Sequence, residues 1–287
     1  MTEKGGLMDK FYVQLDGFSR QLVHDYEGVM TRVAKLGYSG IEIFYGLHGG
    51  YSPEGLKEFL RSINMEVISS HVELEDTDEN LNYLPGTGCK YVVNPGLAIT
   101  TEEEAYEAAG MLNELGKKAK SVGMKYGYHN HSNDFLEVGG KMVNDILIEN
   151  TDPDLVTFEI DIAWAYRADV DAARYIRKHS GRFELVHVKE TLDFPQKLTF
   201  MKPPKKDTKA EKDISGWPRM SPEMAKKLDE MLSINCELGK GIVDMKAVQA
   251  AADAQPCKPI YIVERDYAWT GDIFTTLAAD AGYLRAL

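Results

Sequence analysis

Four strand-like runs of this chain end in side chains that can bind a metal or move a proton. The first is Lys125–His131, which carries two imidazoles two positions apart. The other three end in a carboxylate, an imidazole and a second carboxylate. The residues concerned are His129, His131, Asp161, His187 and Glu264. One such ending would mean little, but four on separate β segments predict a ring of ligands at one mouth of a barrel.

A set of imidazole and carboxylate groups without a thiolate suits one divalent metal ion. We favour Mn²⁺, with Mg²⁺, Co²⁺, Fe²⁺ and Zn²⁺ as alternatives. Asp161, His187 and Glu264 are expected to hold this ion, with His129 as the fourth ligand. Glu159 shares the face of Asp161 and is another candidate for the fourth position, although it lies one layer deeper.

More polar side chains stand at the predicted strand ends than a barrel interior normally holds. Their convergence would cost free energy unless a metal or a substrate paired them. They are Gln14, Glu42, His71, Asn94, Lys189 and Asp266. Glu42 taken alone is interpreted as a carboxylate paired within the fold, and His71 is open between a structural and a functional role. His24, His48 and His179 fall in helical or loop segments and are interpreted as surface residues.

Strand-like and helical runs alternate along the chain, which favours a parallel sheet with helices outside. Eight such units predict a single (β/α)8 TIM barrel over residues 1–287, with its active site at the C-terminal ends of the strands. The rival is a doubly wound open sheet, but no Gly-x-Gly-x-x-Gly follows the first strand. The predicted strands are Phe11–Leu15, Gly40–Phe44, Glu66–Val72, Tyr91–Asn94, Lys125–His131, Thr157–Asp161, Glu184–Val188 and Ile260–Glu264.

Capping signals mark two of the helices between these strands. Ser52 is a predicted N-cap followed by a proline, and Thr101–Glu104 is a capping box. The segment Glu75–Gly88 carries Pro85 and two glycines. A stunted or irregular helix is therefore expected there.

One long irregular region, Thr191–Gly241, follows the seventh strand. A loop of this length in a compact domain is usually functional or disordered. We expect it to fold over the barrel mouth or against a second subunit, with Trp217 as its apolar anchor; a disordered surface loop is the alternative. Glu237, in the glycine-rich end of this region, is interpreted as a substrate-side group.

The charge and cysteine content limit the classes of function. The chain has 33 Lys and Arg against 45 Asp and Glu, a net charge of −12. This acidity argues against a nucleic-acid binder, whose affinity depends on phosphate contacts. Three separated cysteines without a Cys-x-x-Cys pair indicate reduced thiols in a cytoplasmic protein. The first ten residues lack the apolar core of a secretory signal, and no long apolar run predicts a membrane span.

The order and spacing of several short motifs resemble the xylose-isomerase-like barrel superfamily of sugar phosphate isomerases and epimerases. The resemblance covers nearly the whole chain. The matching pieces are Leu36–Glu42, Tyr128–His131, Glu159–Trp164, His187–Lys189, Glu237–Gly241 and Ile262–Asp266. In members similar to ketose 3-epimerases, Glu, Asp, His and Glu from strands five to eight hold one divalent metal. The last three match Asp161, His187 and Glu264, whereas the strand-five Glu falls on His129, where this chain departs.

The resemblance implies an enzyme that removes a proton next to the carbonyl of a sugar, keto-sugar or cyclitol, with a metal stabilising the enediolate. Return of the proton gives an isomerase or epimerase, which is the expected reaction. Loss of a β-substituent gives a dehydratase or lyase acting on an inosose, a keto-sugar or a 3-keto-glycoside. The missing strand-five Glu puts two-base epimerisation in doubt. His131 is the favoured replacement base, because an imidazole titrates near neutral pH.

The same resemblance suggests roles for other residues. Glu264 would double as an acid or base, Lys189 would stabilise an oxyanion and Trp164 would stack on the sugar ring. His71 and Glu237 would line the substrate site. Two other classes stay open: a non-catalytic barrel that docks a partner, and a DNA repair enzyme similar to endonuclease IV. The expected partner is a small sugar or keto-sugar, with a homo-oligomer possible and neither nucleic acid nor membrane involved.

Overall fold

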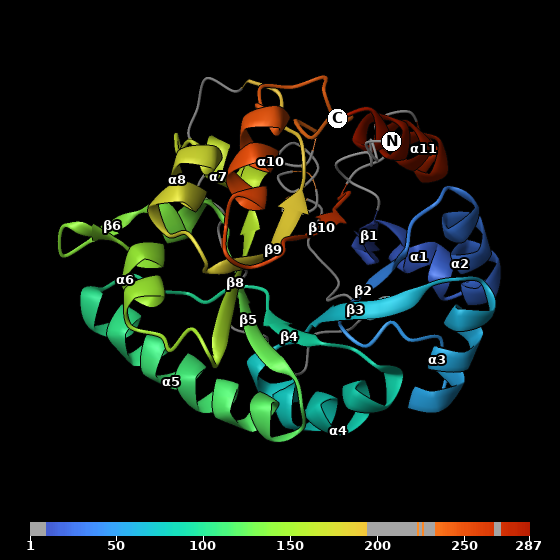
Figure 1. Cartoon of the computed structure of the whole chain (residues 1–287), viewed down its shortest axis with the longest axis horizontal. Coiled ribbons are helices and arrows are strands. Elements are labelled where there is room, and N and C mark those ends of the chain that lie inside the picture. Colours follow the sequence, from blue (N-terminus) through green and yellow to red (C-terminus); the bar gives the residue numbers. More distant parts are fainter. Residues whose placement is uncertain (1–9, 194–222, 224–225, 227–232, 267–270) are drawn as a thin grey trace, which may run out of the picture.

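The computed structural model describes residues 10–193, 223, 226, 233–266 and 271–287. At its centre is a closed barrel of parallel strands, in which the first and last strands pair with each other (Figure 1). The predicted fold class is therefore confirmed. In order around the barrel the strands are β1 (Phe11–Gln14), β2 (Gly40–Phe44), β3 (Glu66–His71), β4 (Tyr91–Asn94), β5 (Lys125–His129), β8 (Val156–Asp161), β9 (Phe183–Val188) and β10 (Ile260–Val263).

The barrel interior changes from apolar to polar along the strands. A small cluster of buried side chains fills the barrel below the polar strand ends, on the N-terminal side: Tyr12, Ile68, Val93, Leu185 and Ile262. Side chains two positions apart on a strand share a face, so His187 follows Leu185 and Glu264 follows Ile262 toward the mouth. The strand pairing also sets Asp161 level with His187. The polar strand ends predicted from the sequence thus meet in one layer.

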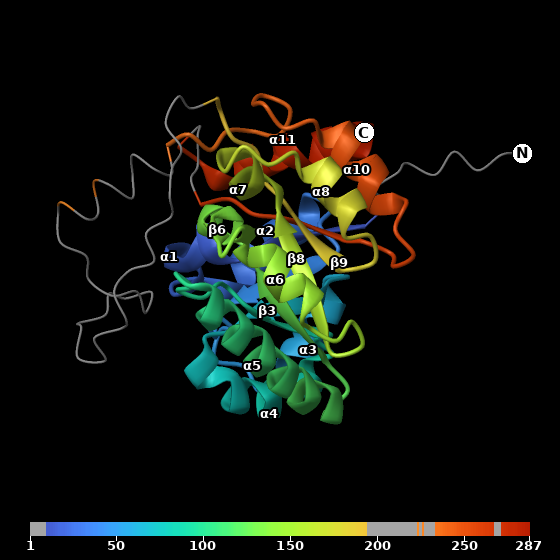
Figure 2. The same ribbon diagram turned by 90° about the vertical axis from the view of Figure 1, so that its left-hand side faces the viewer.

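Helices cover the outside of the barrel. In both views α4 and α5 lie on one side, and α10 and α11 lie on the other (Figures 1 and 2). The helices are α1 (Ser19–Leu22), α2 (Tyr26–Lys35), α3 (Pro53–Ser62), α4 (Thr77–Thr87), α5 (Glu102–Ser121), α6 (Val143–Glu149), α7 (Ile162–Arg167), α8 (Ala172–Lys178), α10 (Met245–Asp253) and α11 (Ile273–Ala286). Ser52 accepts the Gly55 N–H at 3.1 Å, and Thr101 and Glu104 form the predicted capping box.

The third helix of the barrel is regular, so the prediction of a stunted or irregular one was wrong. α4 spans Thr77–Thr87, and Pro85 lies in its last turn. A proline so late in a helix disturbs few of its hydrogen bonds. Gly88 then ends the helix with a φ of 86°, a left-handed conformation that suits glycine.

Among the short elements that were not predicted are a helix after β8 and a hairpin. α7 follows β8 directly and begins where the Asp161 carboxylate accepts the Trp164 N–H at 2.8 Å. Its six residues are too few to show helical periodicity after a buried strand. The other element is an antiparallel hairpin of β6 (Glu137–Val138) and β7 (Lys141–Met142), which stands apart from the barrel.

The two ends of the long segment after β9 meet at the rim of the barrel. Thr191 forms a β-bridge with Asn235, and its carbonyl accepts the Ile242 N–H at 3.0 Å. Much of this segment, Trp217 included, lies outside the described residues, so its predicted placement over the mouth or against a second subunit stays a prediction. None of the helices in the described ranges is long and apolar enough to cross a membrane.

Candidate functional site

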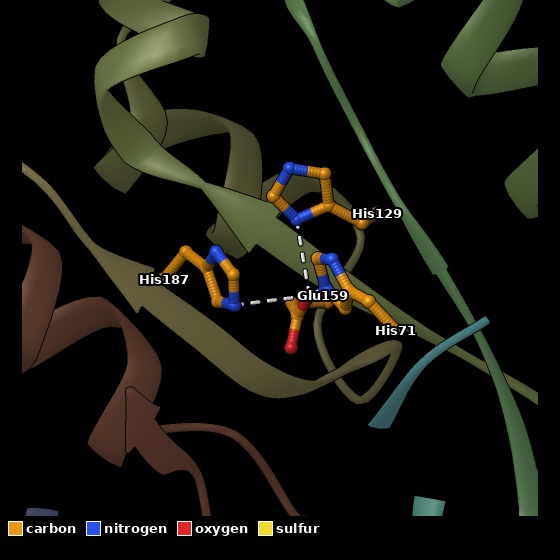
Figure 3. Close-up of side chains that lie close together, drawn as sticks. All are labelled: His71, His129, Glu159 and His187. Atoms are coloured by element: carbon orange, nitrogen blue, oxygen red, sulfur yellow. Dashed lines mark hydrogen bonds and ion pairs between the residues drawn. The ribbon is translucent and has the colours of Figure 1, made fainter. Parts of the chain in front are cut away.

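Three imidazoles converge on one carboxylate oxygen inside the barrel (Figure 3). Glu159 Oε2 lies 2.7 Å from His71 Nε2 and 3.0 Å from His129 Nδ1. It also lies 3.1 Å from His187 Nε2. The residues come from four strands, and none of these side chains is more than 2% exposed. The pairing of β5 with β8 sets His129 level with Glu159, which accounts for part of this convergence.

Glu159 determines which nitrogen His129 turns toward the mouth. Although burial opposes ionisation, the charges of His187 and His71 hold the pKa of Glu159 well below its usual range. An ionised carboxylate only accepts hydrogen bonds, so His129 must carry its proton on Nδ1. Burial lowers the pKa of His129 to about 4. The ring is therefore neutral at pH 7, and its Nε2 keeps a lone pair.

His187 has buried carboxylates at both ring nitrogens, and although burial opposes the charged form, the charges of Glu159 and Glu42 raise its pKa, unlike that of His129. Its Nε2 faces Glu159 and lies 2.8 Å from Glu42 Oε1, and its Nδ1 lies 3.1 Å from Glu264 Oε2. Glu42 also accepts the Ser69 hydroxyl at 2.6 Å. Burial, and then the negative charge of Glu159, raise the pKa of Glu42. These contacts support the interpretation of Glu42 as a carboxylate paired within the fold.

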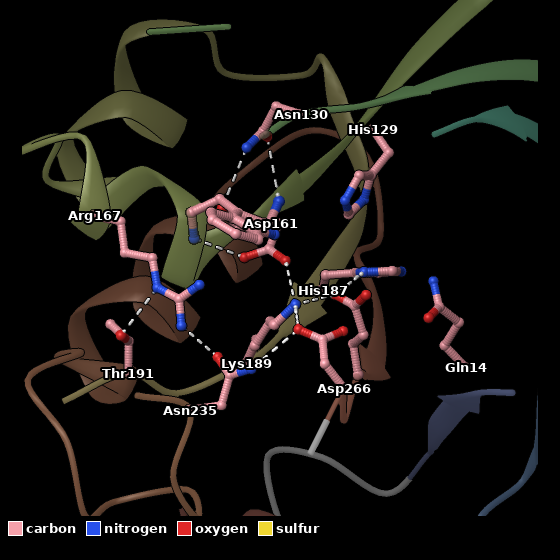
Figure 4. A network of polar contacts seen from close by, with 12 residues as sticks. Gln14, His129, Asn130, Asp161, Arg167, His187, Lys189, Thr191, Asn235 and Asp266 are labelled. Atoms are coloured by element: carbon pink, nitrogen blue, oxygen red, sulfur yellow. Dashed lines mark hydrogen bonds and ion pairs between the residues drawn. The ribbon is translucent and has the colours of Figure 1, made fainter. Parts of the chain in front are cut away.

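Nearer the mouth, the ammonium of Lys189 lies among three carboxylates (Figure 4). Its Nζ is 2.5 Å from Asp266 Oδ2, 3.0 Å from Glu264 Oε2 and 3.7 Å from Asp161 Oδ2. Burial opposes the charged form, but the three carboxylates, Asp266 first, raise the pKa of Lys189. The ammonium also lies 5.2 Å from the centre of the Trp164 ring. Lys189 is therefore a charged, buried donor at the mouth.

The four predicted metal ligands are brought together at this level. His129, Asp161, His187 and Glu264 each offer one ligand atom within 4.8 Å of the others, and all four are buried. Asp161 Oδ1 accepts the Trp164 N–H, whereas its Oδ2 is buried without a hydrogen-bond partner in the part of the chain described. Such an oxygen is costly, and a cation would relieve the cost. Two nitrogens and two oxygens suit a divalent ion.

A deeper set of residues is an alternative cation site. His71, His129, Glu159 and His187 also bring one ligand atom each within 4.8 Å. These atoms already hydrogen-bond to one another, and Gln14 Nε2 lies 3.2 Å from the remaining nitrogen of His71. The ligand atoms of the deeper set are thus already paired with one another, although Glu159 Oε1 has no hydrogen-bond partner among the described residues. The set with Asp161 is the better candidate because its carboxylate oxygen Oδ2 accepts no hydrogen bond from the described residues.

His131 continues the line of β5 into the mouth. Its ring centre lies 5.0 Å from that of His129 and 5.3 Å from that of Trp164. Its side chain accepts the backbone N–H of Asp134, and its own N–H donates to the Asp134 carboxylate at 2.7 Å. Burial, and then His129, hold the pKa of His131 well below its ordinary value. A neutral imidazole has one accepting nitrogen, so the cap leaves the other as an N–H donor.

No protein-family model matches the chain. The inosose dehydratase of Clostridium perfringens (strain 13 / Type A) is 27% identical over 192 residues, which are 58% of this chain and 63% of that protein. A sugar phosphate isomerase/epimerase from Parabacteroides distasonis ATCC 8503 superposes with a TM-score of 0.69 at 21% identity, over 100% of this chain and 96% of that one. The fold is that of the xylose-isomerase-like barrels.

One solved structure of similar fold contains a metal ion. The structure of the IOLI protein, solved with a bound zinc atom, superposes with a TM-score of 0.68 at 14% identity over 95% of both chains. The resemblance predicted from sequence motifs is thus confirmed at the level of the fold. The match to the C. perfringens dehydratase spans less than two thirds of that protein's length.

Polar residues that sequence reasoning missed complete the mouth of the barrel. Asn130 accepts the Asp161 N–H at 3.2 Å and donates to the Asp161 carbonyl at 3.3 Å. Arg167 donates from Nε to Thr191 Oγ1 at 3.1 Å and from Nη2 to Asn235 Oδ1 (Figure 4). Asn130 stands between His129 and His131 and could have been found there. Arg167 and Asn235 show no regular spacing to the other site residues.

Two other sequence predictions concern residues away from this cluster. Glu237 is half-buried and its carbonyl accepts the Lys240 N–H at 3.0 Å, so its substrate-side role stays a prediction. Its loop is held by Glu190, whose carboxylate accepts the N–H of Gly239 at 3.1 Å. His179 was predicted to lie at the surface, which was wrong. Its side chain is 8% exposed, because its Nε2 lies 2.7 Å from the Asp145 carboxylate of α6.

Proposed function

We propose that this chain is a divalent-metal-dependent enzyme that removes a proton next to the carbonyl of a sugar, keto-sugar or cyclitol. The observation that carries the proposal is the convergence of His129, Asp161, His187 and Glu264 beside the buried ammonium of Lys189. This set offers ligands for a cation, a carboxylate to accept a proton and a fixed positive charge within a few ångströms. Sugar-acting names among the similar proteins support the substrate class.

The ion would be held by His129, Asp161, His187 and Glu264, and it would stabilise negative charge developing on the substrate oxygens. Glu159 would keep the two imidazoles oriented for it, as carboxylates behind metal-bound histidines commonly do. We propose Mn²⁺ first, with Mg²⁺, Co²⁺, Fe²⁺ and Zn²⁺ as alternatives. The zinc in the IOLI structure supports a divalent ion.

The remaining steps use side chains of this chain. The Glu264 carboxylate would take the proton from carbon, and the Lys189 ammonium would donate to the oxygen on which charge develops. Trp164 would offer its flat face to the sugar ring. His131 would donate a hydrogen bond to a substrate hydroxyl, because its accepting nitrogen is engaged by Asp134.

Two outcomes follow from the resulting enediolate. If Glu264 returns the proton to the neighbouring carbon, the substrate is isomerised, whereas epimerisation needs a second base on the other face. If the β-hydroxyl leaves instead, its C–O bond breaks, Lys189 gives it a proton and water departs. The engaged nitrogen of His131 weighs against the two-base route. Dehydration is therefore the second candidate function, and the similarity to an inosose dehydratase favours it.

The test is proton exchange in D₂O. Metal-loaded protein would be incubated with inososes, ketoses and 3-keto-glycosides, and deuterium at the carbon next to the carbonyl would be followed by NMR. Exchange is expected for at least one compound, and its product would separate isomerisation from dehydration. No exchange with any of them, at one metal ion per chain, would overturn the proposal and favour a non-catalytic barrel. Salt-dependent retention on DNA would instead favour the endonuclease-like alternative.

A further inference from the structure

Arg167 has one buried nitrogen that contacts nothing in the described part of the chain. The side chain is 7% exposed, and its Nη1 has no hydrogen-bond partner there. Its other two nitrogens are engaged by neutral acceptors, Thr191 Oγ1 and Asn235 Oδ1. Buried donors in native proteins are nearly always paired. An unpaired donor on a charged side chain beside the candidate site is therefore available to a ligand oxygen.

This nitrogen faces the candidate site. Figure 4 shows the unpaired side of the guanidinium turned toward Asp161 and Lys189. The guanidinium carbon lies 4.4 Å from the centre of the Trp164 ring, the same ring that lies 5.2 Å from the Lys189 ammonium. Asn235 also donates to Asp266 Oδ2 at 3.0 Å, which ties Arg167 to the carboxylates of the rim.

We propose that Arg167 binds the substrate through a single hydrogen bond from Nη1 to an uncharged oxygen, and so selects neutral ketones over carboxylated or phosphorylated ones. The inference rests on the proposed function and narrows its substrate class to neutral keto-sugars and cyclitols. On this inference Arg167 contacts the substrate, in addition to its hydrogen bonds from α7 to Thr191 and Asn235.

The choice of a neutral oxygen follows from the geometry of the fork. Arginine recognises a carboxylate or phosphate with two adjacent nitrogens. Here Nε donates to Thr191 and Nη2 to Asn235, so each pair of adjacent nitrogens has one member already engaged. Nη1 alone can serve one oxygen.

The chain offers a matched control in Arg182. It too has a buried nitrogen without a partner among the described residues, and it donates from Nη2 to Thr151 at 2.8 Å. Its guanidinium lies 5.2 Å from the Phe158 ring. It precedes β9, at the end of the barrel away from the mouth. Replacement of Arg182 should therefore lower the stability of the fold without changing ligand binding at the site.

The experiment measures binding to metal-loaded protein by calorimetry, with scyllo-inosose as the neutral probe and 3-dehydroshikimate as the carboxylated one. We expect tighter binding of the inosose by the natural protein. Arg167→Met should weaken inosose binding at least tenfold with metal content unchanged, and Arg182→Met should change it less than twofold. An unchanged affinity in Arg167→Met, tighter binding of 3-dehydroshikimate, or binding of neither probe would overturn the inference.

A second variant tests the broken fork directly. Asn235→Ala frees Nη2 beside Nη1 and should strengthen 3-dehydroshikimate binding at least threefold. No gain in affinity would overturn the inference. This test can be made even if Arg167→Met does not fold. Failure of the proposed function looks different. Inosose binding would then still depend on Arg167, but no deuterium would enter the inosose in D₂O.

Discussion

Asp161 is the single residue on which the proposed metal site depends most. Its buried Oδ2 has no hydrogen-bond partner among the described residues and lies 3.7 Å from the Lys189 ammonium, while its Oδ1 caps α7. We predict that Asp161→Asn lowers metal affinity by about a hundredfold or more, because an amide oxygen is a weaker ligand than a carboxylate. Metal analysis after dialysis measures this. Asp145→Asn, outside the site, should retain full metal content, and equal metal in both variants would contradict the assignment.

Glu159 acts on the metal through the imidazoles. We predict that Glu159→Gln lowers metal affinity by about 10–100-fold, the usual effect of removing a group that orients metal-bound histidines. It should also destabilise the fold by about 3–5 kcal/mol, because buried partners lose a charge. Glu42→Gln is the matched control, since Glu42 contacts His187 but not His129. Metal titration separates them: an equal loss of affinity in both would argue against a specific role for Glu159.

Single residues also show where sequence reasoning ends. His129, Asp161, His187 and Glu264 could be found because each stands at the end of a strand, and parallel strand ends meet in a barrel. The capping of His131 by Asp134 could not, because it depends on a turn that only the folded chain displays. For the same reason the unpaired nitrogen of Arg167 has no counterpart in the sequence pattern.

At the scale of elements, α6 and α8 are joined by one buried carboxylate. Asp145 on α6 accepts hydrogen bonds from the Tyr175 hydroxyl at 2.8 Å and the Lys178 ammonium at 2.6 Å, and lies 2.7 Å from His179 Nε2. Although burial opposes ionisation, the contacts with His179, Lys178 and Tyr175 hold the pKa of Asp145 well below its usual range. The ionised form therefore stabilises the fold.

We predict that Asp145→Asn lowers the free energy of unfolding by about 1–3 kcal/mol at pH 7. The unfolded carboxyl titrates near pH 3.9, above the folded pKa. The stabilisation that Asp145 gives the fold is thus complete above the unfolded pKa, and it is lost as the pH falls below about 4. Urea unfolding at pH 7 and pH 3.5 measures the difference, which should shrink at the lower pH. Glu149→Gln, on an exposed pair with Lys141, should cost under about 1 kcal/mol at either pH.

How well the sequence predicts a helix or strand depends on the length of that element. The barrel strands and the capped helices α3 and α5 follow from periodicity and end signals spread over many residues. α7 has six residues and directly follows a buried strand, so no periodic pattern could separate it. α4 was misjudged because Pro85 was weighed as a breaker without its position in the last turn being known.

At the scale of the whole molecule, the candidate site exists only when the barrel is closed. Its ligands come from β5, β8 and β9 and from the residue after β10, and β10 is held in place by its pairing with β1. An unfolded chain has no preformed site, so metal binding adds to the free energy of folding. This coupling gives a readout of the metal that does not depend on knowing the substrate.

We therefore predict that removing the metal with a chelator lowers the thermal stability of the whole chain. With free metal at about a thousand times its dissociation constant, binding stabilises the folded state by about 4 kcal/mol. For a domain of this size that corresponds to about 8 °C in the unfolding midpoint, at about 2 °C per kcal/mol. Calorimetry with and without added Mn²⁺ or Zn²⁺ measures the shift. Asp161→Asn should lose most of it, because the variant lacks the ligand whose unpaired oxygen the ion would satisfy. The same shift in Asp161→Asn as in the natural chain would place the stabilising ion elsewhere, with the deeper set around Glu159 as the next site to test.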